Sequence, residues 1–265
     1  MRLNGEILAW GLGACLAGCA TEPATVEPNT LSDAEKKEGW ELLWDGRTTK
    51  GWVGVKDGCK SFPKSSWVID NGVLTVYPVK GTEAKPWTKA PTKEVWAQAG
   101  GDIATERTFK DFAFKVDFRL TPAANSGIKY FFDENVNNGT TLEYQMLEKG
   151  HADWNKGRNG NRRVASLYDM MPANADRYLK PTGEWNTVLL VSKGPHVEHW
   201  LNGVKVLEYE RGGKAFMEAF KMSKYADASY FNKNGKWGLS PVGRILIQDH
   251  TDSTVSFRNI KVKEL

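Results

Sequence analysis

The residues best suited to chemistry are carboxylates, amides and imidazoles in the second half of the chain, beginning with Glu143 and Gln145. One residue separates them, so on a β-strand both side chains point to the same face. A carboxylate beside an amide can bind sugar hydroxyls or a divalent metal, and the carboxylate can also move protons. The alternative is a solvated outer face, but Tyr144 and Met146 occupy the alternate positions as core residues would. We interpret Glu143 as a catalytic base or a metal ligand.

A second pair with the same spacing, Gln248 and His250, lies near the C-terminus. Histidine titrates near neutral pH and can serve as base, acid or ligand, although a backbone carbonyl can also hold a histidine at a strand end. His151 and Asp153 follow Glu143 in a polar loop, where the histidine is either functional or only exposed and the aspartate could orient it or share a metal. A Glu, Gln, His and Asp set could hold a divalent metal through oxygen and nitrogen ligands, and the sequence leaves its presence open.

Four other polar residues could bind a substrate, and each also has a structural interpretation. Asn125 could donate its amide to a sugar, but the Ser-Gly that follows it is also typical of a turn. Lys129 and Arg107 could polarise a carbonyl group or pair with a carboxylate. Tyr168 could donate a hydrogen bond to a sugar oxygen or fill the core.

The elements that must position these residues are mostly β-strands. Residues 112–120 alternate strictly between apolar and polar side chains, which predicts a strand with one buried and one wet face. The Asn-Gly pairs at 71–72 and 202–203 predict the tight turns of two hairpins, 67–77 and 197–209. The apolar spacing changes from two to three between Phe257 and Ile260, which predicts a bulge at Arg258-Asn259. Many short strands at this spacing predict an all-β sandwich.

Two segments depart from the strand pattern. Residues 80–99 predict a long loop with a helical turn, and residues 213–226 predict one short amphipathic helix.

A chain of 265 residues fits a single sandwich domain. The net charge of +4 is small and its lysines are interleaved with acidic residues, so we expect no nucleic-acid partner. Glycine-rich phosphate loops, cysteine metal spacings and the Gly-x-Ser-x-Gly motif are absent.

The first residues are typical of an exported lipoprotein. Arg2 precedes a short apolar stretch, residues 7–18, and Leu16-Ala17-Gly18-Cys19 matches a bacterial lipobox. We therefore expect a signal peptide over 1–18, lipidation of Cys19, a flexible tether over 19–38 and one domain over 39–265. Ala20 favours the outer membrane of a Gram-negative bacterium, on either face. The alternative is a poor signal peptide with a chance cysteine, and Cys59 has no obvious disulfide partner.

Several motifs occur in a fixed order from Gly39 to the C-terminus. They are Trp-Glu-Leu-Leu-Trp-Asp-Gly at 40–46, Asn-Ser-Gly-Ile at 125–128, Glu-Tyr-Gln at 143–145, Ser-Leu-Tyr-Asp at 166–169, Gly-Glu-Trp-Asn at 183–186, Trp-Leu-Asn-Gly at 200–203, Gly-Arg-Ile-Leu-Ile-Gln-Asp-His at 243–250 and Phe-Arg-Asn-Ile at 257–260. In this order they resemble the 3-keto-disaccharide hydrolase family, formerly a domain of unknown function. That resemblance implies a concanavalin A-like jelly-roll β-sandwich.

The resemblance also implies an unusual cleavage of 3-keto-glycosides. A partner dehydrogenase oxidises the sugar at carbon 3, a base removes the acidified hydrogen of carbon 2, β-elimination expels the glycosidic oxygen, and water adds back. Such a site needs a base, an enolate stabiliser and an acid. We assign acid, base or ligand functions to Glu143, His151 and His250, and substrate binding mainly to the amides and to Lys129. This hypothesis requires Glu143 and His250 to converge on one cavity.

Three other functions remain open on the sequence alone. An ordinary glycoside hydrolase would act on unoxidised glycosides. A non-catalytic carbohydrate-binding lipoprotein would use the same sandwich, because this fold also serves lectins. A structural surface protein would have a flat polar surface instead of a concave site around Glu143 and His250.

Overall fold

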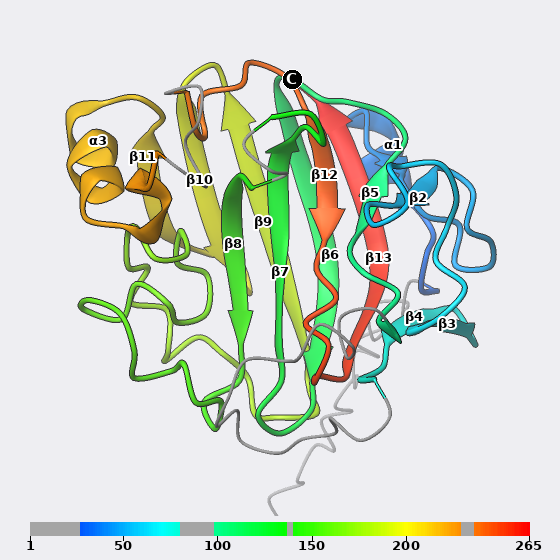
Figure 1. Ribbon diagram of the computed structural model, residues 1–265. Helices are drawn as coiled ribbons and strands as arrows, with labels where there is room; N and C mark the ends of the chain where they lie inside the picture. Colours follow the sequence, from blue (N-terminus) through cyan, green and yellow to red (C-terminus); the bar gives the residue numbers. More distant parts are fainter. Residues whose placement is uncertain (1–26, 80–97, 137–139, 229–235) are drawn as a thin grey trace, which may run out of the picture.

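The computed structural model describes residues 27–79, 98–136, 140–228 and 236–265. In these residues two antiparallel sheets pack face to face (Figure 1). The larger sheet has the order β11-β10-β9-β6-β13-β4-β3, with β1 also pairing with β13, and the smaller has the order β2-β5-β12-β7-β8. The expected all-β jelly-roll sandwich is confirmed.

The strand bounds follow the apolar runs of the sequence. The larger sheet contains β1 (Glu41–Leu42), β3 (Trp67–Asp70), β4 (Val73–Val76), β6 (Phe112–Leu120), β9 (Trp185–Lys193), β10 (His196–Leu201), β11 (Val204–Glu210) and β13 (Val255–Glu264). The smaller contains β2 (Trp52–Gly54), β5 (Ile103–Thr105), β7 (Asn125–Phe132), β8 (Leu142–Leu147) and β12 (Arg244–Ile247). The described helices are α1 (Asp33–Lys37), α3 (Lys214–Lys221) and the 3₁₀ turn η2 (Lys224–Ala226).

Strand β6 shows how alternation builds the core between the sheets. Phe112, Phe114, Val116 and Phe118 are fully buried, and β6 lies between β9 and β13 near the middle of the larger sheet. Each such side chain contributes about 1.5–3 kcal/mol of burial free energy relative to exposure. The polar residues on the other side of the strand are only partly buried. The predicted amphipathic strand is therefore confirmed.

The predicted turns and bulge are also confirmed. Asn71 and Asn202 both adopt positive φ (47° and 51°) ahead of their glycines, as tight hairpin turns require. Strand β13 shifts its register against β6 between Arg258 and Lys261, and Asn259 there has a φ of 55°. The Nδ2 group of Asn259 donates to Asp117 (2.7 Å), which fixes the bulge against β6.

Residues 27–38, the second part of the predicted tether, lie against the sandwich. Asn29 and Asn259 exchange two hydrogen bonds, each from a backbone N–H to a side-chain oxygen (2.6 and 2.8 Å). Ser32 and Glu35 form a capping box at the start of α1, and Glu35 pairs with Lys261 of β13 (2.8 Å). These contacts differ from the flexible segment expected here. The signal peptide, Cys19 and residues 20–26 lie outside the described residues.

The predicted helix over 213–226 is wrong in one respect: it is two elements. Helix α3 ends at Lys221, and the hydroxyl of Ser223 accepts from the backbone N–H of Tyr225 (3.2 Å) to begin η2. The carboxylate of Asp169 accepts the N–H of Lys224 (2.9 Å), which holds the new turn against the loop that follows β8. Most of the predicted loop, residues 80–97, lies outside the described residues. In the described part of the chain, no helix has the length and apolar character to cross a membrane.

Candidate active site

A polar cavity opens on the outer face of the smaller sheet. The hydroxyl of Tyr144 donates to the carbonyl of Trp200 in the larger sheet (3.1 Å), so Tyr144 points inward. Its neighbours on β8, Glu143 and Gln145, therefore point outward. The cavity has a volume of about 170 Å³. Its lining includes seven residues that the sequence analysis singled out: Asn125, Lys129, Glu143, Gln145, Tyr168, Gln248 and His250.

Glu143 is buried in this lining, and its neighbours leave room for it. Gly127 on β7 pairs with Gln145, one position diagonal to Glu143, and a Cβ atom there would be 2.3 Å from Glu143 Oε1. The Gln145 amide, with its nitrogen turned towards Glu143, donates to Oε1 (3.0 Å) and to the carbonyl of Ser126 (3.2 Å). The amide nitrogen faces these two groups because a carboxylate and a carbonyl accept hydrogen bonds only. Burial raises the pKa of Glu143 above its ordinary value.

Two lysines add positive charge around this carboxylate. Lys129 is the cross-strand neighbour of Glu143, and its Nζ donates to Asp102 (2.8 Å). Burial alone would lower the pKa of Lys129, but the nearby charges of Asp102 and Glu143 raise it. Lys224 lies with its Nζ 4.7 Å from the centre of the Tyr168 ring. Lys224 is an exposed residue, yet partial removal of water lowers its pKa, opposed by the charge of Glu143.

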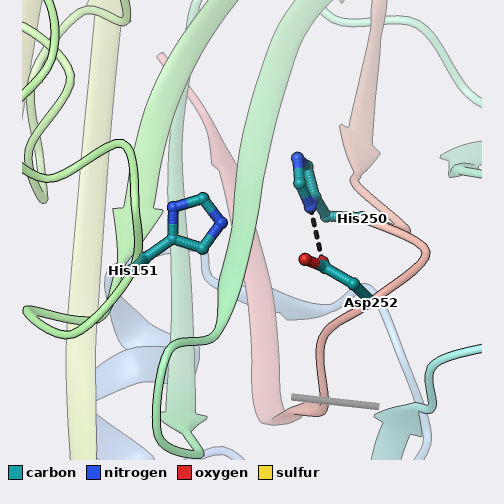
Figure 2. Close-up of side chains that lie close together, drawn as sticks. All are labelled: His151, His250 and Asp252. Carbon is teal, nitrogen blue, oxygen red and sulfur yellow. Dashed lines mark hydrogen bonds and ion pairs between the residues drawn. The ribbon is translucent and has the colours of Figure 1, made fainter. Parts of the chain in front are cut away.

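Two imidazoles meet beside the cavity. His250 lines the cavity, and the buried His151 packs against it edge to face with ring centres 5.7 Å apart. His250 Nδ1 lies 2.8 Å from a carboxylate oxygen of Asp252 (Figure 2). Burial lowers the pKa of His151, and the neighbouring His250 lowers it further. His151, His250 and Asp252 offer ligand atoms within 4.8 Å of one another, so by donor type this group could hold a divalent metal.

Comparison with known proteins identifies the family of the chain, and the match covers nearly all of the described residues. The 3-keto-alpha-glucoside-1,2-lyase-like domain family matches residues 39–263. The chain belongs to this family. A 3-keto-disaccharide hydrolase from Bacteroides thetaiotaomicron is 32% identical over 257 residues, which cover 90% of this chain and 83% of that protein. The chain is therefore an enzyme of the glycoside hydrolase or lyase type.

Solved structures agree with this family at the level of the fold. A crystal structure from Parabacteroides distasonis, described provisionally as a glycosyl hydrolase, has a TM-score of 0.72 and 27% identity and covers 90% of this chain and all of that one. A second structure from the same organism, with the same provisional description, has a TM-score of 0.58 and 22% identity, covering 85% and 99% of the two chains. The second likeness concerns the fold alone.

Two sequence-predicted residues of this lyase-like enzyme lie away from the cavity. Arg107 pairs with Glu41 (2.9 Å) and with Glu264 on the outside of the sandwich, so it does not reach the site. The carboxylate of Asp153 pairs with Lys156 (2.8 Å). Asp153 still orients His151, but through its backbone N–H, which donates to the imidazole Nδ1 (3.0 Å).

Other predicted positions are kept in place by the backbone. Asn125 is buried at the start of β7, where residues 125–130 form a continuous ladder with β8, so of its two interpretations the turn does not hold. Tyr168 donates its backbone N–H to the carbonyl of Glu143 (3.0 Å), which holds its ring at the edge of β8. Gln248 donates its backbone N–H to the carbonyl of Gly127 (3.0 Å). These contacts bring Glu143 and His250 to the same cavity, as the sequence hypothesis required.

The sequence analysis missed four residues of the lining, and it gave no role to Asp252 beside it. The lining also contains Thr140, Thr141, Lys224 and Tyr225, and Asp252 holds His250. Lysines are common at the ends of amphipathic helices, so the helix predicted over 213–226 gives no reason to single out Lys224. The completed lining combines two proton carriers, Glu143 and His250, with two cations. Such a set can remove a proton, stabilise the anion that forms and deliver a proton elsewhere.

Proposed function

We propose that the protein cleaves 3-keto-glycosides, including 3-keto-disaccharides, by elimination and hydration. The observation that carries this proposal is that Glu143 and His250, which are distant in sequence, line one cavity with Lys129 and Lys224. Family membership and the name of the Bacteroides thetaiotaomicron relative support the substrate class.

The chemistry begins at the hydrogen on carbon 2 of the oxidised sugar. The ketone at carbon 3 makes this hydrogen acidic, and a base removes it to leave an enolate. The enolate electrons reform the ketone and make a double bond between carbons 1 and 2, while the bond from carbon 1 to the glycosidic oxygen breaks. An acid protonates the departing oxygen, and water adds across the double bond. Lys129 and Lys224 lie where positive charge would stabilise the enolate.

The lining also separates this proposal from ordinary glycoside hydrolysis. Most glycosidases use two carboxylic acids on opposite sides of the scissile bond, about 5–10 Å apart. Among the described residues that line the cavity, Glu143 is the only carboxylic acid. A single carboxylic acid with an imidazole and two ammonium groups suits enolate chemistry better than an oxocarbenium-like transition state.

Turnover of an oxidised substrate tests the proposal directly. Purified wild-type protein should release glucose from 3-keto-trehalose and should leave trehalose intact. Glu143→Ala should lower that rate by at least about 10²-fold, as loss of a proton carrier does. Glu184→Ala, which alters an exposed carboxylate in another loop, is the matched control. A wild-type rate in Glu143→Ala would contradict the proposal, and so would turnover of trehalose without turnover of 3-keto-trehalose. Sugar binding without turnover would favour a lectin-like protein.

We further propose that a sugar dehydrogenase supplies the ketone and that lipid on Cys19 anchors the enzyme to the cell envelope. The substrate already carries an oxidised carbon 3, so an alcohol oxidation must precede this step. The lipobox at 16–19 supports the anchor. Radiolabelled palmitate should enter the full chain in bacteria and should not enter a Cys19→Ala variant. Equal labelling of the two proteins would exclude the anchor.

A further inference from the structure

The two imidazoles beside the cavity carry their protons on opposite nitrogens. The backbone N–H of Asp153 donates to His151 Nδ1 (3.0 Å), so in neutral His151 the proton is on Nε2. His250 Nδ1 faces a carboxylate oxygen of Asp252 (2.8 Å), which can only accept, so in His250 the proton is on Nδ1. The Nε2 atom of neutral His250 therefore has a lone pair and can take up a proton.

Asp252 is itself held in place by a buried chain of hydrogen bonds. The hydroxyl of Ser253 donates to the same oxygen of Asp252 (2.8 Å), and the backbone N–H of Asn125 donates to that hydroxyl (2.9 Å). Only 6% of the Asp252 side chain is exposed, against 20% for His250. The carboxylate thus faces the imidazole with a fixed orientation, while the imidazole itself reaches the cavity.

The amides between His151 and Glu143 are consistent with the proton on His151 Nε2. Gln145 donates to Glu143, so its oxygen faces the side-chain amide of Asn125 (3.1 Å) and requires a donor there. With the Asn125 amide turned as well, so that its nitrogen donates to Gln145, its oxygen faces His151 Nε2 at the long limit of 3.5 Å. Hydrogen bonds can therefore run in one direction along a series of groups, each donating to the next. The series is the N–H of Asp153, His151, Asn125, Gln145 and the carboxylate of Glu143.

We infer that His250 Nε2 is the base that removes the carbon-2 proton, and that Asp252 is the residue that positions it. His151 instead fixes the amides that hold Glu143. The reaction role of His250 rests on the proposed function, whereas the proton positions do not. The electrons of the carbon 2–hydrogen bond go to the enolate and its proton goes to His250 Nε2. Glu143, a carboxylic acid in the lining of the same cavity, then delivers a proton to the oxygen that leaves carbon 1.

The same proton positions restrict metal binding by the group in Figure 2. A metal-bound histidine coordinates through one nitrogen and usually donates a hydrogen bond from the other. His151 accepts at Nδ1 instead, so coordination through Nε2 would remove its remaining proton. With these hydrogen bonds intact, His151 orients amides and is not a metal ligand.

Nitrogen-15 NMR of histidine-labelled protein tests the proton positions without a substrate. The chain has four histidines, and variants of each assign the signals. His199 is the internal reference, because its Nδ1 lies 2.7 Å from the carbonyl of Ala165 and must carry the proton. We expect a proton on Nδ1 in His250 and on Nε2 in His151. The reverse positions in His250 would overturn the inference.

The Asp252→Asn variant tests whether the carboxylate acts through the imidazole. An amide can turn its N–H towards His250 Nδ1, so we expect the proton of His250 to move to Nε2. The value of kcat should then fall by about 10³-fold or more, with little change in KM. A moved proton with unchanged kcat would exclude His250 as the base. A circular dichroism spectrum like that of the wild type establishes that the variant is folded.

Exchange at carbon 2 links these results to the reaction. In deuterated water the wild type should exchange the carbon-2 hydrogen of a 3-keto-glycoside, and His250→Gln should lose this exchange. Exchange at the wild-type rate in His250→Gln would overturn the assignment of the base. If the proton positions are as expected but the wild type neither exchanges this hydrogen nor forms a product with deuterium on carbon 2, the proposed function fails and the hydrogen-bond assignment stands.

Discussion

Gly127 on β7 leaves the space that Glu143 on β8 fills: a Cβ atom at residue 127 would lie 2.3 Å from Glu143 Oε1. Such a contact is well inside van der Waals distance, so either the carboxylate or the strand must move. Gly127 lies inside a strand, where glycine is otherwise unfavourable. Its closeness to the Glu143 carboxylate gives that glycine a role in the site.

We expect Gly127→Ala to displace the carboxylate and to lower kcat for a 3-keto-disaccharide by about 10²-fold, because small misplacements of reacting groups have effects of this order. Asp is one methylene shorter than Glu, so Glu143→Asp in the same chain should restore part of the activity. Steady-state kinetics of the two single variants and the double variant measure this coupling. Strictly additive losses would show that Gly127 and Glu143 do not share this space.

Replacement of Glu143 by Gln should have an effect that depends on the leaving group. If Glu143 donates the proton to the departing oxygen, an acidic leaving group such as para-nitrophenol needs little help. Glu143→Gln should therefore lose about 10²–10⁴-fold in kcat/KM on 3-keto-trehalose and much less on a para-nitrophenyl 3-keto-glucoside. Carbon-2 exchange should persist. Equal losses on both substrates, together with loss of exchange, would make Glu143 the base.

Lys224 should stabilise the enolate by its charge. Removal of one donor from such a site costs about 10²–10³-fold in kcat, so Lys224→Met should fall in this range and Lys224→Arg should retain more activity. Lys221→Met alters an exposed lysine at the end of α3 and is the matched control. Steady-state kinetics separate kcat from KM. A rise in KM alone would assign Lys224 to substrate binding.

Local sequence patterns predicted much of the fold, and in the site they predicted which neighbouring residues share a face. The same-face pair Glu143 and Gln145 follows from strand alternation, and the hairpin turns follow from Asn-Gly chemistry. The meeting of Glu143 with His250 depends on the sheet order β12-β7-β8, which no local pattern contains. Only the hypothesis based on the motif order of the family predicted that these two residues line one cavity.

The residues that were predicted wrongly or missed depend on contacts that are distant in sequence. Arg107 pairs with Glu41, 66 positions away, and with Glu264, 157 positions away, so its ion pairs were invisible in its own segment. Lys224 lines the cavity because helix α3 ends at Lys221 and Asp169 holds the turn that follows. Helical periodicity predicts neither the end of the helix at Lys221 nor the contact with Asp169. Functional positions of this kind need the tertiary structure.

The pairing of Glu35 with Lys261 makes stability depend on pH. Burial alone would raise the pKa of Glu35, but hydrogen bonds from Lys261 and from the N–H of Ser32 lower it from 4.5 to about 2. A carboxylate with a lowered folded-state pKa stabilises the fold above its unfolded pKa, and this contribution is lost as the pH falls from about 4.5 to about 2. Glu35→Gln should therefore reduce the free energy of unfolding by roughly 1–2 kcal/mol at pH 7, allowing for partial exposure.

Urea denaturation of the wild type and Glu35→Gln between pH 7 and pH 3 measures this difference. The two curves should approach each other as the pH falls, because protonation removes the charge that the variant lacks. Glu184→Gln, whose carboxylate is exposed, should follow the wild type throughout. A Glu35→Gln deficit that stays constant down to pH 3 would mean that packing around α1, and not the ion pair with β13, holds residues 27–38 on the sandwich.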